Sequence, residues 1–423
     1  MLQLQFIRDN KELVINRLKI KNFDASGLVE EIINLDNARR STQKNLDDNL
    51  AKSNQLAKEI GKLFKEGQRE QAETVRKEST ELKTITKDLD QVLNNIKADL
   101  NAKLIELPNI PHESVKAGKS DADNEIVYEE STIPELGKNA LPHWELASKY
   151  DIIDFDLGSK VTGAGFPFYK GKGARLQRAL INFFLDEAIN KNYIEYQPPL
   201  LINEDSGFGT GNLPDKEGQM YYIGEDKLYL IPTAEVPITN IYRNVLLKEG
   251  DLPIKNVAYS NCFRREAGSY GKDVRGLNRL HQFDKVEIVQ LALPEKSYDV
   301  LEEMKDHVAD LLRKLELPFR ISRLCGGDIS FTASLTYDFE VYSAAQKRWL
   351  EVSSVSNFEN FQANRMKLRY KSKKGKSVLA HTLNGSALAL PRIVAALLEN
   401  NQSEDGINIP EQLRVYTGFD KID

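Results

Sequence analysis

The stretch that says most about the fold of this 423-residue chain reads Cys262-Phe263-Arg264-Arg265-Glu266-Ala267-Gly268-Ser269-Tyr270-Gly271, continuing through Arg275-Gly276 to His281-Gln282-Phe283-Asp284-Lys285-Val286-Glu287. Its pattern predicts a strand, a glycine-rich loop and a second strand. Strand side chains alternate, so Phe283 and Glu287 share one face, where a ring and a carboxylate are able to address two parts of one ligand. Taken alone, Arg264-Arg265-Glu266 equally fits a surface ion-pair cluster, and Phe283 fits the core.

Three other stretches carry polar residues of the same kind. Thr233 and Glu235 lie between two prolines and face the same way if the backbone is extended. Glu351 lies in an apolar and hydroxyl-rich strand, where a carboxylate is able to hold a Mg²⁺ that bridges phosphates. The third is a strand around Leu383 that gives way to an apolar helix with Arg392 in its early turns. For Glu235 and Glu351 the alternative is an ordinary charge at a strand edge.

The region around these stretches predicts an α+β domain. From about residue 128 onward, short alternating strands and Gly/Pro turns mix with a few amphipathic helices, which is typical of a mainly antiparallel sheet flanked by helices. The prolines, glycine and polar residues between residues 107 and 121 indicate a linker. We therefore expect two domains, residues 1–115 and residues 116–423.

The first of these domains contains a long helical hairpin. Helix breakers are almost missing between residues 27 and 107. Alternate steps of four and three residues from Leu28 to Leu63 land mostly on apolar residues, which is the pattern of a heptad seam. A second seam is expected at Val75, Leu82, Ile85, Leu89, Val92 and Ile96. Glu66-Gly67-Gln68 is a natural reversal between them. The pattern predicts an antiparallel coiled-coil arm over about residues 27–104, each helix about 60 Å long.

Composition excludes several classes of protein. The chain lacks an apolar run long enough to span a membrane and does not begin like a secretory signal, so we expect a cytoplasmic protein. Two distant cysteines and five scattered histidines argue against disulfide and zinc frameworks. The net charge of −5 restricts any RNA contact to local surfaces.

Common nucleotide-binding motifs are also missing. Gly118-Lys119-Ser120 and Gly375-Lys376-Ser377 lack the earlier glycine of a P-loop, and Gly209-Thr210-Gly211 lacks the third glycine of a dinucleotide fingerprint. The basic run from Lys367 to Lys376 suggests either an RNA patch or a mobile hairpin loop, and its turn composition favours the loop.

Together, the arm and the four motif stretches closely resemble the bacterial type of seryl-tRNA synthetase, a class II aminoacyl-tRNA synthetase, over nearly the whole chain. The stretch from Phe263 to Glu287 resembles class motif 2, and Leu383 to Arg392 resembles motif 3. The helix from Ala174 to Asn190, followed by a strand ending at Pro198-Pro199, resembles motif 1, which implies a homodimer.

The resemblance implies roles for individual residues. Arg264, Glu266 and Arg392 would be the catalytic set, with Arg264 on the α-phosphate and the substrate carboxylate, Glu266 and Phe283 on adenine, and Arg392 on the γ-phosphate. The implied ATP-binding residues are Arg264, Arg265, Glu266, Phe283, Glu351, Val352, Ser353, Ser354 and Arg392, with Glu351 holding Mg²⁺ through ATP. The implied serine-binding residues are Thr233, Ala234, Glu235, Arg264, Glu287, Asn384 and Ser386. Which glutamate takes the ammonium and which the hydroxyl stays open.

The implied function is ATP-dependent activation of L-serine and its transfer to tRNA(Ser), and by family also to tRNA(Sec), with the arm as the tRNA-binding element. One alternative is a related ligase that charges a carrier protein instead of tRNA. The other is a coiled-coil RNA-binding or scaffold protein without catalysis. The retained arm disfavours the first alternative, and the complete set of polar site residues disfavours the second.

Overall fold

The computed structural model describes residues 1–130, 132–266 and 275–423 and divides the chain into two compact units. The first unit comprises Met1–Lys19 and Phe23–Pro108, and the second comprises Ile20–Asn22 and Asn109–Asp423. The break after Pro108 lies within the predicted linker, a little before residue 115. What each domain does remains a prediction.

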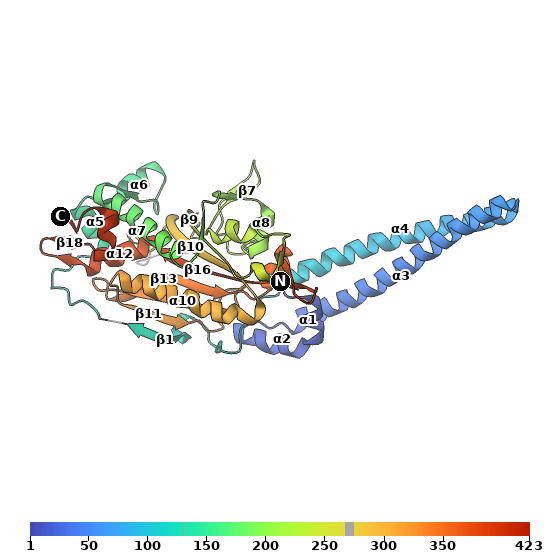
Figure 1. Ribbon diagram of the computed structural model, residues 1–423, viewed down its shortest axis with the longest axis horizontal. Helices are drawn as coiled ribbons and strands as arrows, with labels where there is room; N and C mark the ends of the chain where they lie inside the picture. Colours follow the sequence, from blue (N-terminus) through green and yellow to red (C-terminus); the bar gives the residue numbers. More distant parts are fainter. Residues whose placement is uncertain (131, 267–274) are drawn as a thin grey trace. The chain divides into compact units, whose positions relative to one another are not determined.

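The first unit contains a long antiparallel helical hairpin (Figure 1). Its helices are α1 (Leu4–Asp9), α2 (Lys11–Leu18), α3 (Ser26–Lys65) and α4 (Arg69–Glu106). With 40 residues, α3 is about 60 Å long, as expected. The chain reverses at Gly67, whose φ of 79° lies in the left-handed region that glycine adopts without strain. The predicted arm and its turn are confirmed.

The seam of this hairpin was predicted well for α3 and only partly for α4. In α3, Ile32, Leu46 and Leu56 are buried, as expected. In α4 the expectation is wrong for Ile85 and Val92, which are each 48% exposed. Buried or half-buried positions of α4 instead run through Ala72, Val75, Ser79, Leu82, Thr86, Leu89, Leu93, Ile96 and Leu100. Val75, Leu82, Leu89 and Ile96 are inner positions as predicted, whereas Thr86 and Leu93 take the inner places that were assigned to their neighbours Ile85 and Val92.

The second unit is built on an eight-stranded sheet in the described residues. In spatial order its strands are β1 (Glu125–Glu130), β11 (Phe319–Arg323), β12 (Leu335–Ser343), β13 (Arg348–Asn357), β16 (His381–Ala389), β10 (Gln282–Ala292), β9 (Ile254–Phe263) and β4 (Ile194–Tyr196). All neighbouring pairs are antiparallel except β4 and β9, which are parallel. The mainly antiparallel α+β fold is confirmed.

The two faces of this sheet have different surroundings. On β10, Val286 and Ile288 point into one large apolar core shared with α7 (Gly171–Ile189), α10 (Ser297–Lys314) and α12 (Leu390–Asn400). The alternate residues Lys285 and Glu287 therefore point to the opposite face. Polar side chains buried on that face form the site described below.

Smaller elements surround the sheet in the second unit. The remaining helices are α5 (His143–Lys149), α6 (Phe155–Val161), α8 (Glu204–Thr210), α9 (Glu235–Asn240), α11 (Phe361–Met366) and α13 (Glu411–Thr417). The remaining strands are β2 (Ile153–Asp154), β3 (Phe168–Tyr169), β5 (Leu201–Ile202), β6 (Tyr222–Ile223), β7 (Leu228–Leu230), β8 (Leu246–Lys248), β14 (Arg369–Lys371), β15 (Ser377–Leu379), β17 (Gln402–Ser403), β18 (Gly406–Asn408) and β19 (Lys421–Ile422). None of the helices described here is both long and apolar enough to cross a membrane.

Two local predictions are also met. The basic run from Lys367 to Lys376 forms the hairpin of β14 and β15, which turns at Gly375 with a φ of 77°. The helix expected from Ala174 to Asn190 corresponds to α7, and β4 follows it and ends at Tyr196, before Pro198-Pro199; the resemblance to motif 1 stays a prediction. Whether the hairpin moves remains a prediction.

Candidate active site

A buried carboxylate, Glu287, lies at the centre of a cluster of polar side chains on this face of the sheet, which we call the polar pocket. Its Oε2 lies 2.5 Å from Lys285 Nζ, and both side chains are less than a tenth exposed. Thr233 Oγ1 and Ser386 Oγ both donate to the same oxygen, over 3.3 and 3.4 Å. Three separate segments therefore meet at Glu287: the turn before α9, strand β10 and strand β16.

A second carboxylate, Glu235, belongs to the same pocket but is held differently. The extended backbone considered for Thr233 and Glu235 is wrong, because Ala234 is in the helical region and Glu235 begins α9. Even so, Glu235 N donates to Thr233 Oγ1 over 3.2 Å. The Glu235 carboxylate accepts from Gln362 Nε2 over 2.7 Å, and Thr382 Oγ1 orients Gln362 through a 2.7 Å bond to its Oε1.

The two carboxylates differ in electrostatic environment. Burial, together with the nearby charge of Glu287, raises the pKa of Glu235 to about 7, although Gln362, Lys285 and Arg264 oppose the rise. Glu287 has the Lys285 ammonium in direct contact. Glu235 makes no comparable ion pair in the part of the chain that the structure describes. The pocket therefore combines one neutralised carboxylate lined by hydroxyls with one carboxylate that lacks a cation.

Arg264 lies at the end of β9, next to this pocket. Its Cζ lies 5.3 Å from the centre of the Phe283 ring, and its backbone N donates to His281 O over 2.9 Å. Because the guanidinium lowers the pKa of Glu235, it is close enough to act on the acidic pocket as well. Arg264 thus lies between an aromatic platform and the carboxylates.

The two residues after Arg264 diverge. Glu266 has a φ of 48° and accepts from Arg279 Nη1 over 3.1 Å. Arg265 points elsewhere, with its Cζ 5.9 Å from the Tyr221 ring centre. The rest of the glycine-rich loop, from Ala267 to Gly271, lies outside the described residues.

A second polar group lies on β12 and β13. The register of these strands shifts between Phe339 and Glu340, which pair with Ser353 and Glu351. A bulge of this kind changes which side chains share a face, so that Glu351, Ser354 and Asp338 come together. Burial and the nearby Glu351 raise the pKa of Asp338 well above its ordinary range, while a hydrogen bond with Ser354 opposes the rise. Asp338 Oδ1 is buried and has no partner in the described ranges.

Arg392, in the first turn of α12, joins this group. Its Nη1 donates to Glu351 O over 2.6 Å and lies 3.7 Å from Glu351 Oε2. Its Nε donates to Asn278 O over 3.0 Å. Two backbone carbonyls therefore fix the guanidinium next to the exposed carboxylate of Glu351.

The other predicted residues have more indirect positions. Ala234 and Val352 point their side chains into apolar cores, so they are able to serve a ligand only through their backbones. Ser353 Oγ donates to Ser386 O over 2.5 Å and ties β13 to β16. Asn384 Nδ2 is buried and has no hydrogen-bond partner among the residues described, which leaves a free donor on the pocket face.

Three site residues were missed by sequence reasoning. Lys285 lies between Phe283 and Glu287, and the alternation of strand side chains was sufficient to find it. Gln362 comes from α11, and Asp338 comes from the register of β12 against β13. No local pattern in the sequence indicates either contact, because both depend on tertiary pairing.

Comparison with known proteins gives consistent results for both units. Residues 1–111 match the family "Seryl-tRNA synthetase N-terminal domain", and residues 222–401 match "tRNA synthetase class II core domain (G, H, P, S and T)". The chain is 49% identical to serine--tRNA ligase of Salinibacter ruber, covering 100% of this chain and 99% of that protein. It is 46% identical to serine--tRNA ligase of Chlorobaculum parvum, with full coverage of both.

A solved structure is similar over the same length. Seryl-tRNA synthetase from Pyrococcus horikoshii, complexed with ATP, superposes with a TM-score of 0.93 at 33% identity, covering 100% of this chain and 99% of that one. Cytoplasmic serine-tRNA ligase from Naegleria fowleri, in complex with AMP, gives a TM-score of 0.88 at 26% identity.

Proposed function

The chain belongs to the seryl-tRNA synthetase family, and from that premise we propose that its pocket activates L-serine with ATP and passes the seryl group to tRNA. The observation that carries the proposal is the pairing of two unlike carboxylates with Arg264. One carboxylate is surrounded by hydroxyls and a lysine, and the other lacks a cation. A serine zwitterion supplies the missing ammonium, a hydroxyl and a carboxylate for the arginine.

We assign the serine ammonium to Glu235. This carboxylate is partly buried and has no ion-pair partner in the described chain, so a bound ammonium compensates its charge. The serine hydroxyl then goes to Glu287, because Lys285 already neutralises that group and Thr233 and Ser386 surround it with hydroxyls. The unpartnered Asn384 Nδ2 is a further donor for the substrate.

The nucleotide lies on the other side of Arg264 in this proposal. Phe283 stacks on adenine, Glu266 accepts from its exocyclic amine, and Arg392 binds the γ-phosphate. The serine carboxylate attacks the α-phosphate, so that a new P–O bond forms as pyrophosphate leaves. No general base is needed, because the nucleophile is already an anion. Arg264 and Arg392 act by alignment and by stabilising the charge on the transferring phosphoryl group.

The residues around Glu351 fit a Mg²⁺ that arrives with ATP. Mg²⁺ prefers oxygen ligands, and the bulge of β13 presents the carboxylates of Glu351 and Asp338 and the hydroxyl of Ser354 together. When bound, the cation neutralises phosphate charge. The unpartnered Oδ1 of Asp338 is the feature that supports this assignment.

Selectivity for serine follows from the pocket's polar groups. A site built to bond a hydroxyl discriminates strongly against alanine, because its buried groups then remain unpaired, and the factor reaches roughly 10⁴. Threonine must be rejected by size, since it retains the hydroxyl.

The coiled-coil arm is proposed to hold tRNA(Ser), and by family also tRNA(Sec). A duplex arm of RNA is read mainly by shape and backbone, which suits a long helical hairpin. We also propose a homodimer formed through α7 and β4, and a cytoplasmic location, both from the family.

Two assays on one preparation test the function. Serine-dependent exchange of pyrophosphate into ATP is expected and distinguishes an enzyme from a scaffold. Charging of serine tRNA is expected as well, and it distinguishes a synthetase from a ligase that loads a carrier protein. Exchange without charging of any serine tRNA contradicts the proposal. The known relatives give the carrier-protein alternative no support.

A further inference from the structure

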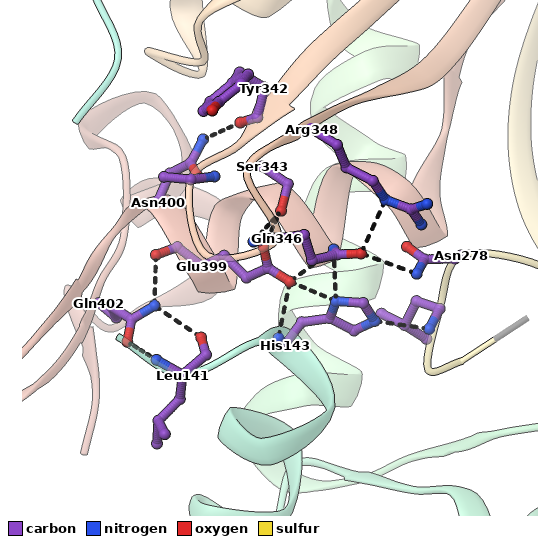
Figure 2. A network of polar contacts seen from close by, with 12 residues as sticks. Leu141, His143, Asn278, Tyr342, Ser343, Gln346, Arg348, Glu399, Asn400 and Gln402 are labelled. Carbon is purple, nitrogen blue, oxygen red and sulfur yellow. Dashed lines mark hydrogen bonds and ion pairs between the residues drawn. The ribbon is translucent and has the colours of Figure 1, made fainter. Parts of the chain in front are cut away.

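A buried imidazole and carboxylate, His143 and Glu399, belong to a network of polar contacts that includes none of the proposed substrate-binding residues among those labelled in Figure 2. Both side chains are fully buried, and His143 Nδ1 lies 2.7 Å from Glu399 Oε1. The same oxygen accepts from His143 N over 2.9 Å, so Glu399 also holds the first residue of α5. Burial opposes ionisation, but hydrogen bonds from His143 and Ser343 outweigh it and lower the pKa of Glu399. Glu399 is therefore ionised.

The second ring nitrogen of His143 holds the chain that returns from the glycine-rich loop. Leu277 N donates to His143 Nε2 over 2.8 Å. A nitrogen that accepts a hydrogen bond carries no proton, so the imidazole is neutral, with its proton on Nδ1 facing Glu399. The carboxylate thus selects the tautomer that receives Leu277 N–H.

Neighbouring residues make close contact at the same place. A Cβ at Gly276 would lie 2.2 Å from His143 Nε2 and clash with it. The φ of Gly276 is 66°, a backbone conformation that also favours glycine. Arg275 lies over the Trp144 ring, with its Cζ 4.7 Å from the ring centre. We call residues 275–281 the return limb. Its first three residues, 275–277, pack against the start of α5.

The return limb touches three groups of the proposed site. Asn278 O accepts from Arg392 Nε, Arg279 pairs with Glu266, and His281 O accepts from Arg264 N. A shift of the limb therefore displaces the carbonyl that fixes Arg392 and the partner that fixes Glu266.

A second connection runs from Glu399 to the same limb. Gln346 Nε2 donates to Glu399 Oε1 over 2.9 Å, and Gln346 Oε1 accepts from Asn278 Nδ2 over 3.1 Å. Glu399 and Arg392 both belong to α12. The Glu399 carboxylate thus fixes the backbone N–H of Leu277 through His143 and the side chain of Asn278 through Gln346.

We propose that His143 and Glu399 are positioning residues for ATP, because they seat the return limb so that Asn278 and Arg279 hold Arg392 and Glu266 in place. The inference rests on the proposed contacts of Arg392 and Glu266 with the nucleotide. Among the contacts described above, the return limb reaches the serine side only through the hydrogen bond from Arg264 N to His281 O, at the end of the limb farthest in sequence from Arg275.

Two variants at one position separate this role from a general effect on folding. In His143→Asn the side-chain amide occupies the position of Nδ1 and still donates to Glu399. The shorter side chain does not reach Leu277 N, so the hydrogen bond from Leu277 N–H is lost. In His143→Gln the amide oxygen reaches the place of Nε2 and accepts from Leu277 N–H. In both, the backbone bond from residue 143 to Glu399 persists.

Pyrophosphate exchange measures the outcome, with the KM for ATP and the KM for serine determined separately. We expect His143→Asn to raise the KM for ATP about tenfold, the scale of one lost hydrogen bond, and His143→Gln to stay within about twofold of the parent. The KM for serine stays unchanged in both. Equal KM values for ATP in the two variants, or parallel changes for serine and ATP, overturn the proposal.

Two further proteins complete the design. Gly276→Ala pushes the limb away from an intact His143 and is expected to raise the KM for ATP in the same direction, which provides a test even if His143→Asn fails to fold. An unchanged KM for ATP in Gly276→Ala overturns the proposal. Arg392→Ala tests the proposed function itself. If Arg392→Ala retains normal use of ATP, the assignment of Arg392 fails, whatever the His143 variants do.

Discussion

Gln362 donates from Nε2 to Glu235 Oε1 over 2.7 Å, so a neutral amide, and not a cation, faces this carboxylate. The free pocket therefore favours the protonated form of Glu235, with a pKa of about 7. A ligand with an ammonium favours the ionised form. This difference makes the binding of serine depend on pH in a range where serine itself does not titrate.

The first prediction concerns the KM for serine. Only ionised Glu235 binds the ammonium, so the KM falls as the pH rises through about 7 and is roughly tenfold higher at pH 6 than at its plateau. Pyrophosphate exchange at saturating ATP measures it. The KM for ATP at saturating serine is the control and should vary less. A KM for serine that is flat between pH 6 and 8 contradicts the assignment of the ammonium to Glu235.

The second prediction concerns stability. The pKa of Glu235 is raised by folding, so its favourable contribution is fully present below its ordinary pKa of 4.5 and is lost as the pH rises through about 7. The Glu235→Gln variant does not lose this stability, because the glutamine side chain does not ionise. Relative to the parent, the variant should gain on the order of 3 kcal/mol in free energy of unfolding between pH 4.5 and pH 8.

Thermal unfolding at pH 5 and pH 8, without ligands, measures that change as a widening difference in Tm. Glu303→Gln, at a half-exposed position that pairs with Lys255, is a matched control with little expected dependence on pH. A constant difference in Tm for Glu235→Gln argues against a raised pKa in the folded state.

The third prediction concerns the buried ion pair. Lys285→Ala leaves Glu287 buried without its cation, which typically costs about 3–5 kcal/mol, and it also removes the neutralisation that lets Glu287 accept the serine hydroxyl. Chemical denaturation and serine-dependent exchange should both decline. Lys255→Ala removes a more exposed pair with Glu303 and should change stability by less than about 1 kcal/mol. Similar effects of the two substitutions would show that burial of the Lys285 pair is unimportant.

The fourth prediction separates the two units. Deleting residues 28–104 removes most of α3 and α4 but leaves every residue of the proposed pocket in place. Charging of serine tRNA should be abolished while pyrophosphate exchange persists. Circular dichroism confirms that the shortened chain is folded. Loss of both activities in a folded deletion contradicts this division of labour.

The sequence predicted those parts of the fold that depend on local pattern. The heptad seam of α3 and the reversal at Gly67 follow from periodicity and from a glycine with positive φ. The face shared by Phe283 and Glu287 follows from strand alternation. The α4 seam was placed wrongly at Ile85, because the inner position belongs to polar Thr86, and at Val92, because an apolar pattern does not distinguish Val92 from its buried neighbour Leu93.

The parts of the site that were missed depend on distant pairing. Asp338 joins Glu351 only because a bulge shifts the register of β12 against β13. Gln362 reaches Glu235 from α11, which lies more than a hundred residues away in the sequence. The Thr233 segment was expected to be extended, but α9 begins at Glu235, and the two side chains still converge through a local hydrogen bond.

The central claim is that Arg264 joins the serine side and the nucleotide side of one pocket, and serine-dependent pyrophosphate exchange by Arg264→Ala tests it most directly. Arg243→Ala is the matched control, because that guanidinium donates to Asn203 and Ser206, neither of which belongs to the proposed site. We predict that exchange is lost in Arg264→Ala and normal in Arg243→Ala. Near-normal exchange by a folded Arg264→Ala protein would contradict the account.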